Sequence, residues 1–176
     1  MRSTNIAAAA ICIATLALAG CNQSSTTTAA GGGGSTGGAP TATAQGGDMS
    51  PEGNKKFLDD NAKKAGVKTT SSGLQYRVIK TGTGKSPTVN DQVTVTYKGW
   101  LIDGTVFDQT EPGQSATFPA GALIPGWVEA LQLMKEGDEW EIVIPSNLGY
   151  GEAGAGGVIP PNQTLVFDMA LLTVQK

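Results

Sequence analysis

Residues 22–47 limit the size of any folded unit in this chain. The segment reads NQSSTTTAAGGGGSTGGAPTATAQGG, with no charged residue, no aromatic residue and nothing larger than glutamine. Such a stretch cannot bury enough apolar surface to offset the entropy lost on ordering, so we expect a disordered, flexible tether. Its 26 residues would give it a root-mean-square reach of ~26–31 Å. The folded part therefore begins near Asp48 and is large enough for one modest core.

The first 20 residues have the pattern of a signal peptide. Arg2 supplies a positive charge, and Ile6–Leu18 is an uncharged apolar run that is short for a membrane span. The run ends in Leu18-Ala19-Gly20-Cys21, which resembles the lipobox of bacterial lipoproteins. This resemblance implies cleavage after residue 20 and a lipid on Cys21. An ordinary cleaved secretory signal is the alternative.

Cys21 would anchor the mature protein to a lipid bilayer. Cys12 lies in the segment removed, so Cys21 would have no disulfide partner. The lipoprotein modification adds more than one acyl chain, which gives stable anchoring. Asn22 follows the cysteine, whereas aspartate there favours retention in the inner membrane of Gram-negative bacteria. We therefore expect a cell-envelope protein, in the outer membrane and facing the periplasm or the surface if the source is Gram-negative.

The composition excludes several kinds of chemistry. Without histidine, Ser-His-Asp and Cys-His catalysis, a His-ligated zinc site and a histidine pH switch are impossible. A net charge of −3 argues against a nucleic-acid partner. The pair Glu139 and Glu141 lies on the outward face of a predicted strand, not across a cleft as a glycosidase needs. Catalysis would therefore depend on carboxylates, hydroxyls, backbone groups or an apolar pocket.

Two glycine-rich motifs resemble nucleotide-binding loops but lack the required context. Gly31–Gly34 has no strand before it and no helix after it. Gly149–Gly154 matches G-x-G-x-x-G, yet the glycines that follow and then Pro160-Pro161 cannot open a helix. Neither motif predicts a nucleotide site, and the sequence predicts no cofactor and no metal.

Residues 48–68 are predicted to form a short amphipathic helix and a lead-in to the domain. Ser50-Pro51-Glu52 combines an N-cap hydroxyl, a first-turn proline and an early acid, which is typical of a helix start. Gly66 is the expected stop. The positions that would share the apolar face are Phe57, Leu58, Asn61, Ala62 and Ala65.

Beyond this helix the period of the apolar positions changes to two, which is typical of strands. The strands expected are Leu74–Val78, Val93–Lys98, Glu139–Ile144 and Thr164–Val174. Asp103-Gly104 predicts a type I′ hairpin turn. Near Gly126–Met134 three apolar residues recur at spacings of four and three, which indicates one helix; they are Trp127, Leu131 and Met134. The pattern predicts an α+β fold in which this helix packs on an antiparallel sheet.

Aromatic residues are few but occur in recognisable motifs. The motifs are Val95-Thr-Tyr97-Lys-Gly99-Trp-Leu-Ile-Asp103-Gly104-Thr-Val-Phe107-Asp108, Leu123-Ile-Pro-Gly-Trp127, Leu148-Gly-Tyr150-Gly151 and Val158-Ile-Pro-Pro-Asn-Gln-Thr-Leu-Val-Phe167-Asp168. In this order they resemble FKBP-type peptidyl-prolyl cis-trans isomerases over residues 74–176. The lead-in, Asn61–Lys68 and Ser72–Tyr76, resembles the bacterial macrophage infectivity potentiator branch, in a lipoprotein form. For any one aromatic residue, a place in the core is the simpler alternative.

The resemblance implies an isomerase domain at residues 69–176, with a five- to six-stranded antiparallel sheet wrapped around one short helix. It implies isomerisation of X–Pro bonds in unfolded or exported polypeptides outside the cytoplasm. The implied catalytic residues are Tyr97, Phe107, Asp108, Trp127, Tyr150 and Phe167, and the implied substrate-binding residues are Leu123, Ile124, Ile159 and Phe118. Tyr150 and the Ile124 amide would donate to carbonyls of the bound peptide. Rapamycin-type macrolides are further candidate ligands.

The chain departs from the family pattern in three places. Ala116 replaces an aromatic wall residue of many members, and Gly154–Gly157 replaces bulkier residues. Both departures weaken the expectation of tight macrolide binding. The long helical dimerisation region of the infectivity potentiator branch is absent, so we expect a monomer. Two other functions stay open: a peptide-binding chaperone module with little catalysis, and an envelope lipoprotein that acts only as a spacer.

Overall fold

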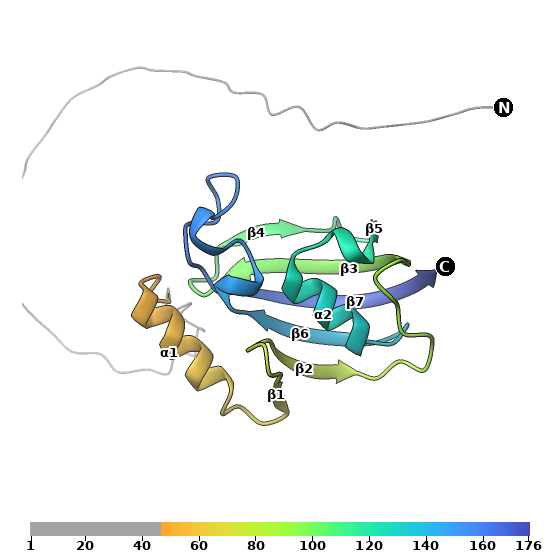
Figure 1. Ribbon diagram of the computed structural model, residues 1–176, viewed down its shortest axis with the longest axis horizontal. Coiled ribbons are helices and arrows are strands. Elements are labelled where there is room, and N and C mark those ends of the chain that lie inside the picture. Colours follow the sequence, from red (N-terminus) through yellow and green to blue (C-terminus); the bar gives the residue numbers. More distant parts are fainter. Residues whose placement is uncertain (1–46) are drawn as a thin grey trace, which may run out of the picture. The chain divides into compact units, whose positions relative to one another are not determined.

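The computed structural model describes residues 47–176 (Figure 1). The predicted signal peptide, the lipidation site Cys21 and the predicted tether up to residue 46 lie outside the described residues. The elements are α1 (Pro51–Asn61), β1 (Val67–Thr69), β2 (Gln75–Lys80), β3 (Gln92–Leu101), β4 (Val106–Gln109), β5 (Ala116–Pro119), η1 (Ala120–Ala122), α2 (Pro125–Leu133), β6 (Glu139–Ile144), η2 (Ser146–Leu148), η3 (Gly151–Ala153) and β7 (Leu165–Gln175). Neither α1 nor α2 is long and apolar enough to span a bilayer.

All the strands pair antiparallel in one sheet, with α2 lying across one of its faces (Figure 1). The order is β1-β2-β6-β7-β3-β4, and β5 pairs with a further part of β3. This confirms the predicted α+β class. The sheet has seven strands instead of five to six. The additional β1 and β5 have three and four residues, too few for alternation to distinguish them from loops.

Helix α1 begins where the sequence predicts and ends earlier. The Ser50 hydroxyl accepts a hydrogen bond from the Gly53 amide at 3.1 Å, which caps the first turn. The helix ends at Asn61, and the amides of Lys63 and Lys64 bond three residues back, which tightens the last turn. Gly66, with a φ of +79°, lies outside the helix and turns the chain into β1.

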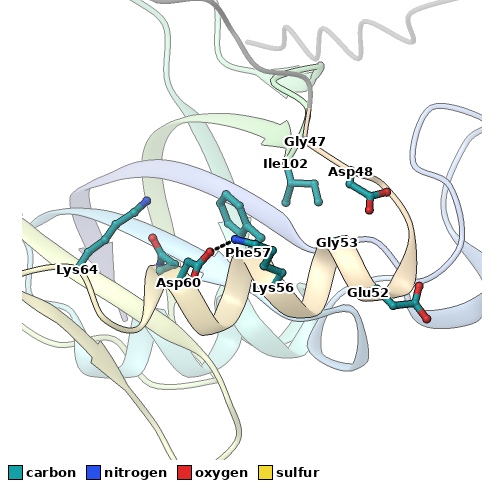
Figure 2. A pocket seen from close by; sticks show the side chains of 10 residues that line it. Gly47, Asp48, Glu52, Gly53, Lys56, Phe57, Asp60, Lys64 and Ile102 are labelled. Carbon is teal, nitrogen blue, oxygen red and sulfur yellow. Dashed lines mark hydrogen bonds and ion pairs between the residues drawn. The ribbon is translucent and has the colours of Figure 1, made fainter.

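The face that α1 buries matches the predicted apolar face only in part: Asn61 belongs to both, whereas Asn54 is outside the predicted face. Asn54 and Asn61 are its buried residues, whereas Ala62 and Ala65 are exposed. Phe57 is half-buried beside a hollow that it shares with Ile102 (Figure 2). The helix therefore docks largely through side-chain amides, which a pattern of apolar residues does not reveal.

The hairpin between β3 and β4 has a three-residue loop, so the predicted type I′ turn is wrong. The Gly104 amide donates to the Leu101 carbonyl, and the Leu101 amide donates to the Thr105 carbonyl, both at 2.9 Å. Gly104 has a φ of +89°, but Asp103 does not have the positive φ that a type I′ turn requires. The Asp103 carboxylate instead accepts the Thr105 amide at 2.8 Å, which closes the loop.

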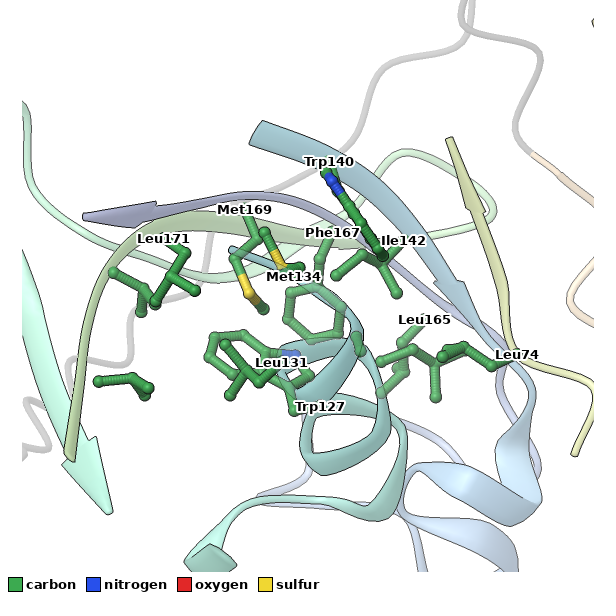
Figure 3. Close-up of a cluster of buried hydrophobic side chains, with 14 of the residues drawn as sticks. Leu74, Trp127, Leu131, Met134, Trp140, Ile142, Leu165, Phe167, Met169 and Leu171 are labelled. Atoms are coloured by element: carbon green, nitrogen blue, oxygen red, sulfur yellow. The ribbon is translucent and has the colours of Figure 1, made fainter. Parts of the chain in front are cut away.

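The core lies between α2 and the sheet (Figure 3). The three predicted core residues of the helix, Trp127, Leu131 and Met134, are all buried. They meet side chains of the central strands, among them Phe167 and Met169 of β7. Gly126 permits this approach, because a Cβ there would lie 2.5 Å from Cγ2 of the buried Ile144. The close contact of α2 with β6 therefore depends on a glycine.

Gly126→Ala should destabilise the protein. Alanine is the better helix former by ~1 kcal/mol, but the added methyl would overpack the contact with Ile144 and cost ~1–3 kcal/mol. Urea unfolding followed by circular dichroism measures the change. Gln132→Ala, on the exposed face of the same helix, should alter the free energy of unfolding by less than ~0.5 kcal/mol. A Gly126→Ala protein as stable as the wild type would contradict this account.

Candidate active site

A cleft of about 180 Å³ lies between the sheet and α2. It brings together residues from β3, β4, β5, α2 and β7, from the turn before α2 and from the loop before η3. Its lining residues are Tyr97, Phe107, Asp108, Phe118, Leu123, Ile124, Trp127, Tyr150 and Phe167. Nine of the ten residues proposed for catalysis and substrate binding therefore line one cleft.

The aromatic rings of the cleft meet on the indole of Trp127. The rings of Tyr97, Phe167 and Phe118 lie 5.0, 5.2 and 6.2 Å from it, with interplanar angles of 84°, 82° and 84°. Phe107 extends the cluster by an edge contact with Phe167 at 5.4 Å. Edge-to-face contacts are the favoured arrangement of aromatic pairs, so the rings form a defined apolar surface.

Gly99 permits two of these rings to close over β3. A Cβ at this position would lie 2.6 Å from Cε1 of Phe167 and 2.7 Å from Cζ of Phe107. Gly99 pairs with Phe167 on one side and with Asp108 on the other. The motifs and their spacing do not predict a role for Gly99. The sequence does contain a relevant signal, because an isolated glycine inside a strand often marks a site where another group approaches the backbone closely.

The polar groups of the cleft lie at its edge. The Tyr97 hydroxyl donates to Oδ2 of Asp108 at 2.7 Å. Burial raises the pKa of Tyr97, and its hydrogen bond to Asp108 and the negative charge there raise it further. Burial, followed by the charge of Asp108, also raises the pKa of Tyr150. Both hydroxyls therefore stay protonated and able to donate at neutral pH.

Two donors at the cleft remain available to a ligand. The Tyr150 side chain is 40% exposed at the cleft edge, and no hydrogen bond within residues 47–176 uses its hydroxyl. The Ile124 carbonyl accepts from the amides of Trp127 and Val128 at 2.9 and 3.1 Å, while its own amide has no partner within the same residues. A peptide with carbonyl groups on both sides of an apolar ring fits this arrangement.

Ile159 is the one proposed site residue that does not line the cleft. It is buried in the core, and its backbone pairs with Ala155 in both directions at 2.9 Å. Ala116 lies on β5 opposite Val95 and is also not a lining residue. The glycines of the segment Gly154–Gly157 are explained by backbone conformation, since Gly154, Gly156 and Gly157 all adopt positive φ, which glycine tolerates best.

The hollow beside α1 lacks this lining of aromatic rings. This hollow, of about 530 Å³, is lined partly by exposed charged side chains, and Lys56 and Asp60 pair with each other there (Figure 2). Within residues 47–176 no three His, Cys, Asp or Glu side chains gather where they could hold a metal ion. The cleft on Trp127 is therefore the candidate active site.

Known proteins resemble the chain over about 70% of its length. The peptidyl-prolyl cis-trans isomerase Mip of Coxiella burnetii is 54% identical over 126 residues, which is 71% of this chain and 55% of that protein. The outer membrane protein MIP of Legionella longbeachae is 52% identical over 121 residues, 68% of this chain and 52% of that protein. The chain thus spans about half the length of these curated relatives.

A solved structure and two family models complete the comparison. The crystal structure of a peptidyl-prolyl cis-trans isomerase from Pseudomonas syringae pv. tomato has a TM-score of 0.68 and 37% identity, over 80% of this chain and all of that chain. Residues 41–78 match the family described as the domain amino terminal to FKBP-type peptidyl-prolyl isomerase. The FKBP-type peptidyl-prolyl cis-trans isomerase domain matches residues 83–172, which is 90 of 176 residues. The chain therefore belongs to the FKBP-type peptidyl-prolyl cis-trans isomerase family.

Proposed function

We propose that the cleft binds the proline ring of an X–Pro segment and accelerates rotation about its peptide bond in unfolded or exported proteins. The observation that carries this proposal is a small apolar cleft of aromatic rings with two free donors, the Tyr150 hydroxyl and the Ile124 amide, at its edge. Family membership supports the same reaction.

The reaction suits a site without an acid or base in contact with the substrate. Rotation about the peptide bond has a barrier of ~18–20 kcal/mol, and uncatalysed X–Pro isomerisation takes tens to hundreds of seconds. No covalent bond breaks, so no nucleophile is needed. The twisted amide has lost resonance and is less dipolar than the planar one, so an apolar cleft favours it. Each ~1.4 kcal/mol of this preference gives a tenfold higher rate.

Seven of the nine lining residues have a specific role in this proposal. The Trp127 indole forms the floor, and Tyr97, Phe107 and Phe167 form the walls. Tyr150 and the Ile124 amide donate to carbonyls beside the proline. Asp108 accepts the Tyr97 hydroxyl at 2.7 Å and so fixes that ring instead of acting on the substrate.

We propose that the protein acts in the cell envelope, held to a bilayer by lipid on Cys21 with residues 22–47 as a tether. The signal pattern supports this location, and one relative is named an outer membrane protein. We also propose a monomer. Rapamycin-type macrolides would enter the same cleft, with binding weakened by Ala116 and by the small residues Gly154–Gly157.

Tyr150→Phe should lower kcat/KM for a short X–Pro peptide by roughly two- to tenfold, the effect of one lost hydrogen bond. The measurement is cis-to-trans relaxation of the peptide with the full chain. Tyr76→Phe is the matched control, because that ring stacks on Trp140 at 4.4 Å and does not line the cleft. Phe167→Ala should lower activity further.

Equal activity of folded Tyr150→Phe and wild-type protein would remove Tyr150 from the proposed site. A folded wild-type chain that does not accelerate relaxation would overturn the proposed catalysis. If that chain still suppressed aggregation of an unfolded protein, the chaperone function would replace it.

The benefit of the Tyr150 hydroxyl should persist above the ordinary tyrosine pKa of about 10. The raised pKa of Tyr150 keeps the hydroxyl protonated as pH rises past that value. Wild type should stay more active than Tyr150→Phe there, and the two should converge once Tyr150 ionises. Rates of both proteins across pH, with circular dichroism to confirm folding, measure this. Convergence at or below pH ~10 would contradict this prediction.

Cys21→Ser should abolish lipid labelling and move the protein out of the membrane fraction. The substitution removes the thiol that would carry the lipid. Labelling of cells with a radioactive fatty acid, followed by fractionation, measures both effects. Membrane retention of an unlabelled Cys21→Ser protein would show a different anchor.

A further inference from the structure

The loop that carries Tyr150 is held differently from the rest of the cleft. Tyr97 and Phe167 lie inside strands that are paired on both sides. Tyr150 instead precedes η3, at the start of a loop that runs to β7 and contains four glycines with positive φ. Glycines make a loop conformationally permissive, so contacts with other segments must fix its ends.

One hydrogen bond closes the two ends of this loop into a neck. The Asn162 amide donates to the Gly151 carbonyl at 2.7 Å, directly after Tyr150. Asn162 is the one non-glycine residue with positive φ in residues 47–176, at +60°. Such a conformation is retained where surrounding contacts hold it. The next two residues, Gln163 and Thr164, are buried.

Those two residues are held by a side chain of α1. Oδ1 of Asn54 accepts the Thr164 amide at 2.8 Å, and Nδ2 of Asn54 donates to Oε1 of Gln163 at 3.0 Å. Both bonds are buried. Nε2 of Gln163 then donates to the carbonyls of Met49 and Pro161 at 3.1 and 3.0 Å. Asn54 therefore holds the C-terminal side of the neck through the backbone of Thr164 and through the side chain of Gln163.

We propose that Asn54 is a positioning residue for catalysis, which holds the neck at Asn162 and thereby places the Tyr150 hydroxyl at the cleft. This inference rests on the proposed isomerase function. It makes α1 a support of the active site, although no residue of α1 lines the cleft.

The same helix supplies a matched control. Asn61 is also buried, and its Nδ2 donates to Oε1 of Gln75 at 2.9 Å. It lies two turns from Asn54, or ~10 Å along the helix axis. Its contact is with β2 and not with the loop. Asn61→Ala therefore loses a comparable buried amide bond without touching the neck.

The test is a double-mutant cycle on the full chain, with kcat/KM for the X–Pro peptide as the readout. Asn54→Ala should lower kcat/KM about fivefold in the wild-type background, or ~1 kcal/mol. It should change kcat/KM less than about twofold in the Tyr150→Phe background, where the hydroxyl is already absent. Asn61→Ala should leave kcat/KM unchanged, even where it lowers the melting temperature as much as Asn54→Ala does. If Asn54→Ala fails to fold, Gln163→Ala removes the acceptor of Asn54 Nδ2 from the loop side, while the bond from the Thr164 amide to Oδ1 of Asn54 remains.

Hydrogen exchange provides a readout that does not depend on catalysis. Asn54→Ala should speed exchange of the Asn162 amide, which is not a partner of Asn54 but closes the neck. Asn61→Ala should not. An inactive wild type with this exchange pattern would overturn the isomerase proposal and leave the neck contact intact. Unchanged exchange at Asn162 would overturn the positioning role. So would the same fivefold loss of kcat/KM from Asn54→Ala in the Tyr150→Phe background as in the wild type.

Discussion

Three rings meet the indole of Trp127 nearly at right angles, and the cleft exists because of those contacts. Edge-to-face contact ties the position of each ring to the plane of the indole. The indole in turn is placed by α2, whose close contact with β6 needs the missing side chain of Gly126. A second missing side chain, at Gly99, leaves room for Phe107 and Phe167. The shape of the site is therefore determined as much by two absent methyl groups as by the aromatic residues.

The cleft combines a rigid part with a part that is held from outside. Its floor and walls belong to α2 and the sheet, where backbone ladders fix the side chains. The donor Tyr150 stands on a glycine-rich loop and depends on the amide contacts between Asn54, Gln163 and Thr164. For bond rotation this division is useful. In the proposed reaction the apolar part would discriminate against the planar amide, while the donor would need only to follow a carbonyl of the peptide.

Much of the fold could be predicted from the sequence because its long strands alternate regularly and α2 has a clear apolar stripe. The nine cleft residues came from motif resemblance, since composition and periodicity alone place the same aromatics in the core. Three features could not be predicted. β1 and β5 are too short to show a period. The type of the hairpin turn depends on the φ of Asp103, which the residue type alone does not determine. The buried face of α1 includes Asn61, which belongs to the predicted face, and Asn54, which does not and whose amide partners are distant in sequence.

The position of β7 has a consequence for how the molecule assembles. β7 follows every other strand in the chain, yet it lies between β6 and β3. Without β7, the pairings β1-β2-β6 and β3-β4-β5 would be two separate groups of strands, each with an unpaired edge. Closing them requires contacts between residues distant in sequence, which makes such steps slow and leaves edges open to association. A protein proposed to assist the folding of others thus has no cleft of its own until the strand that carries Phe167 is inserted.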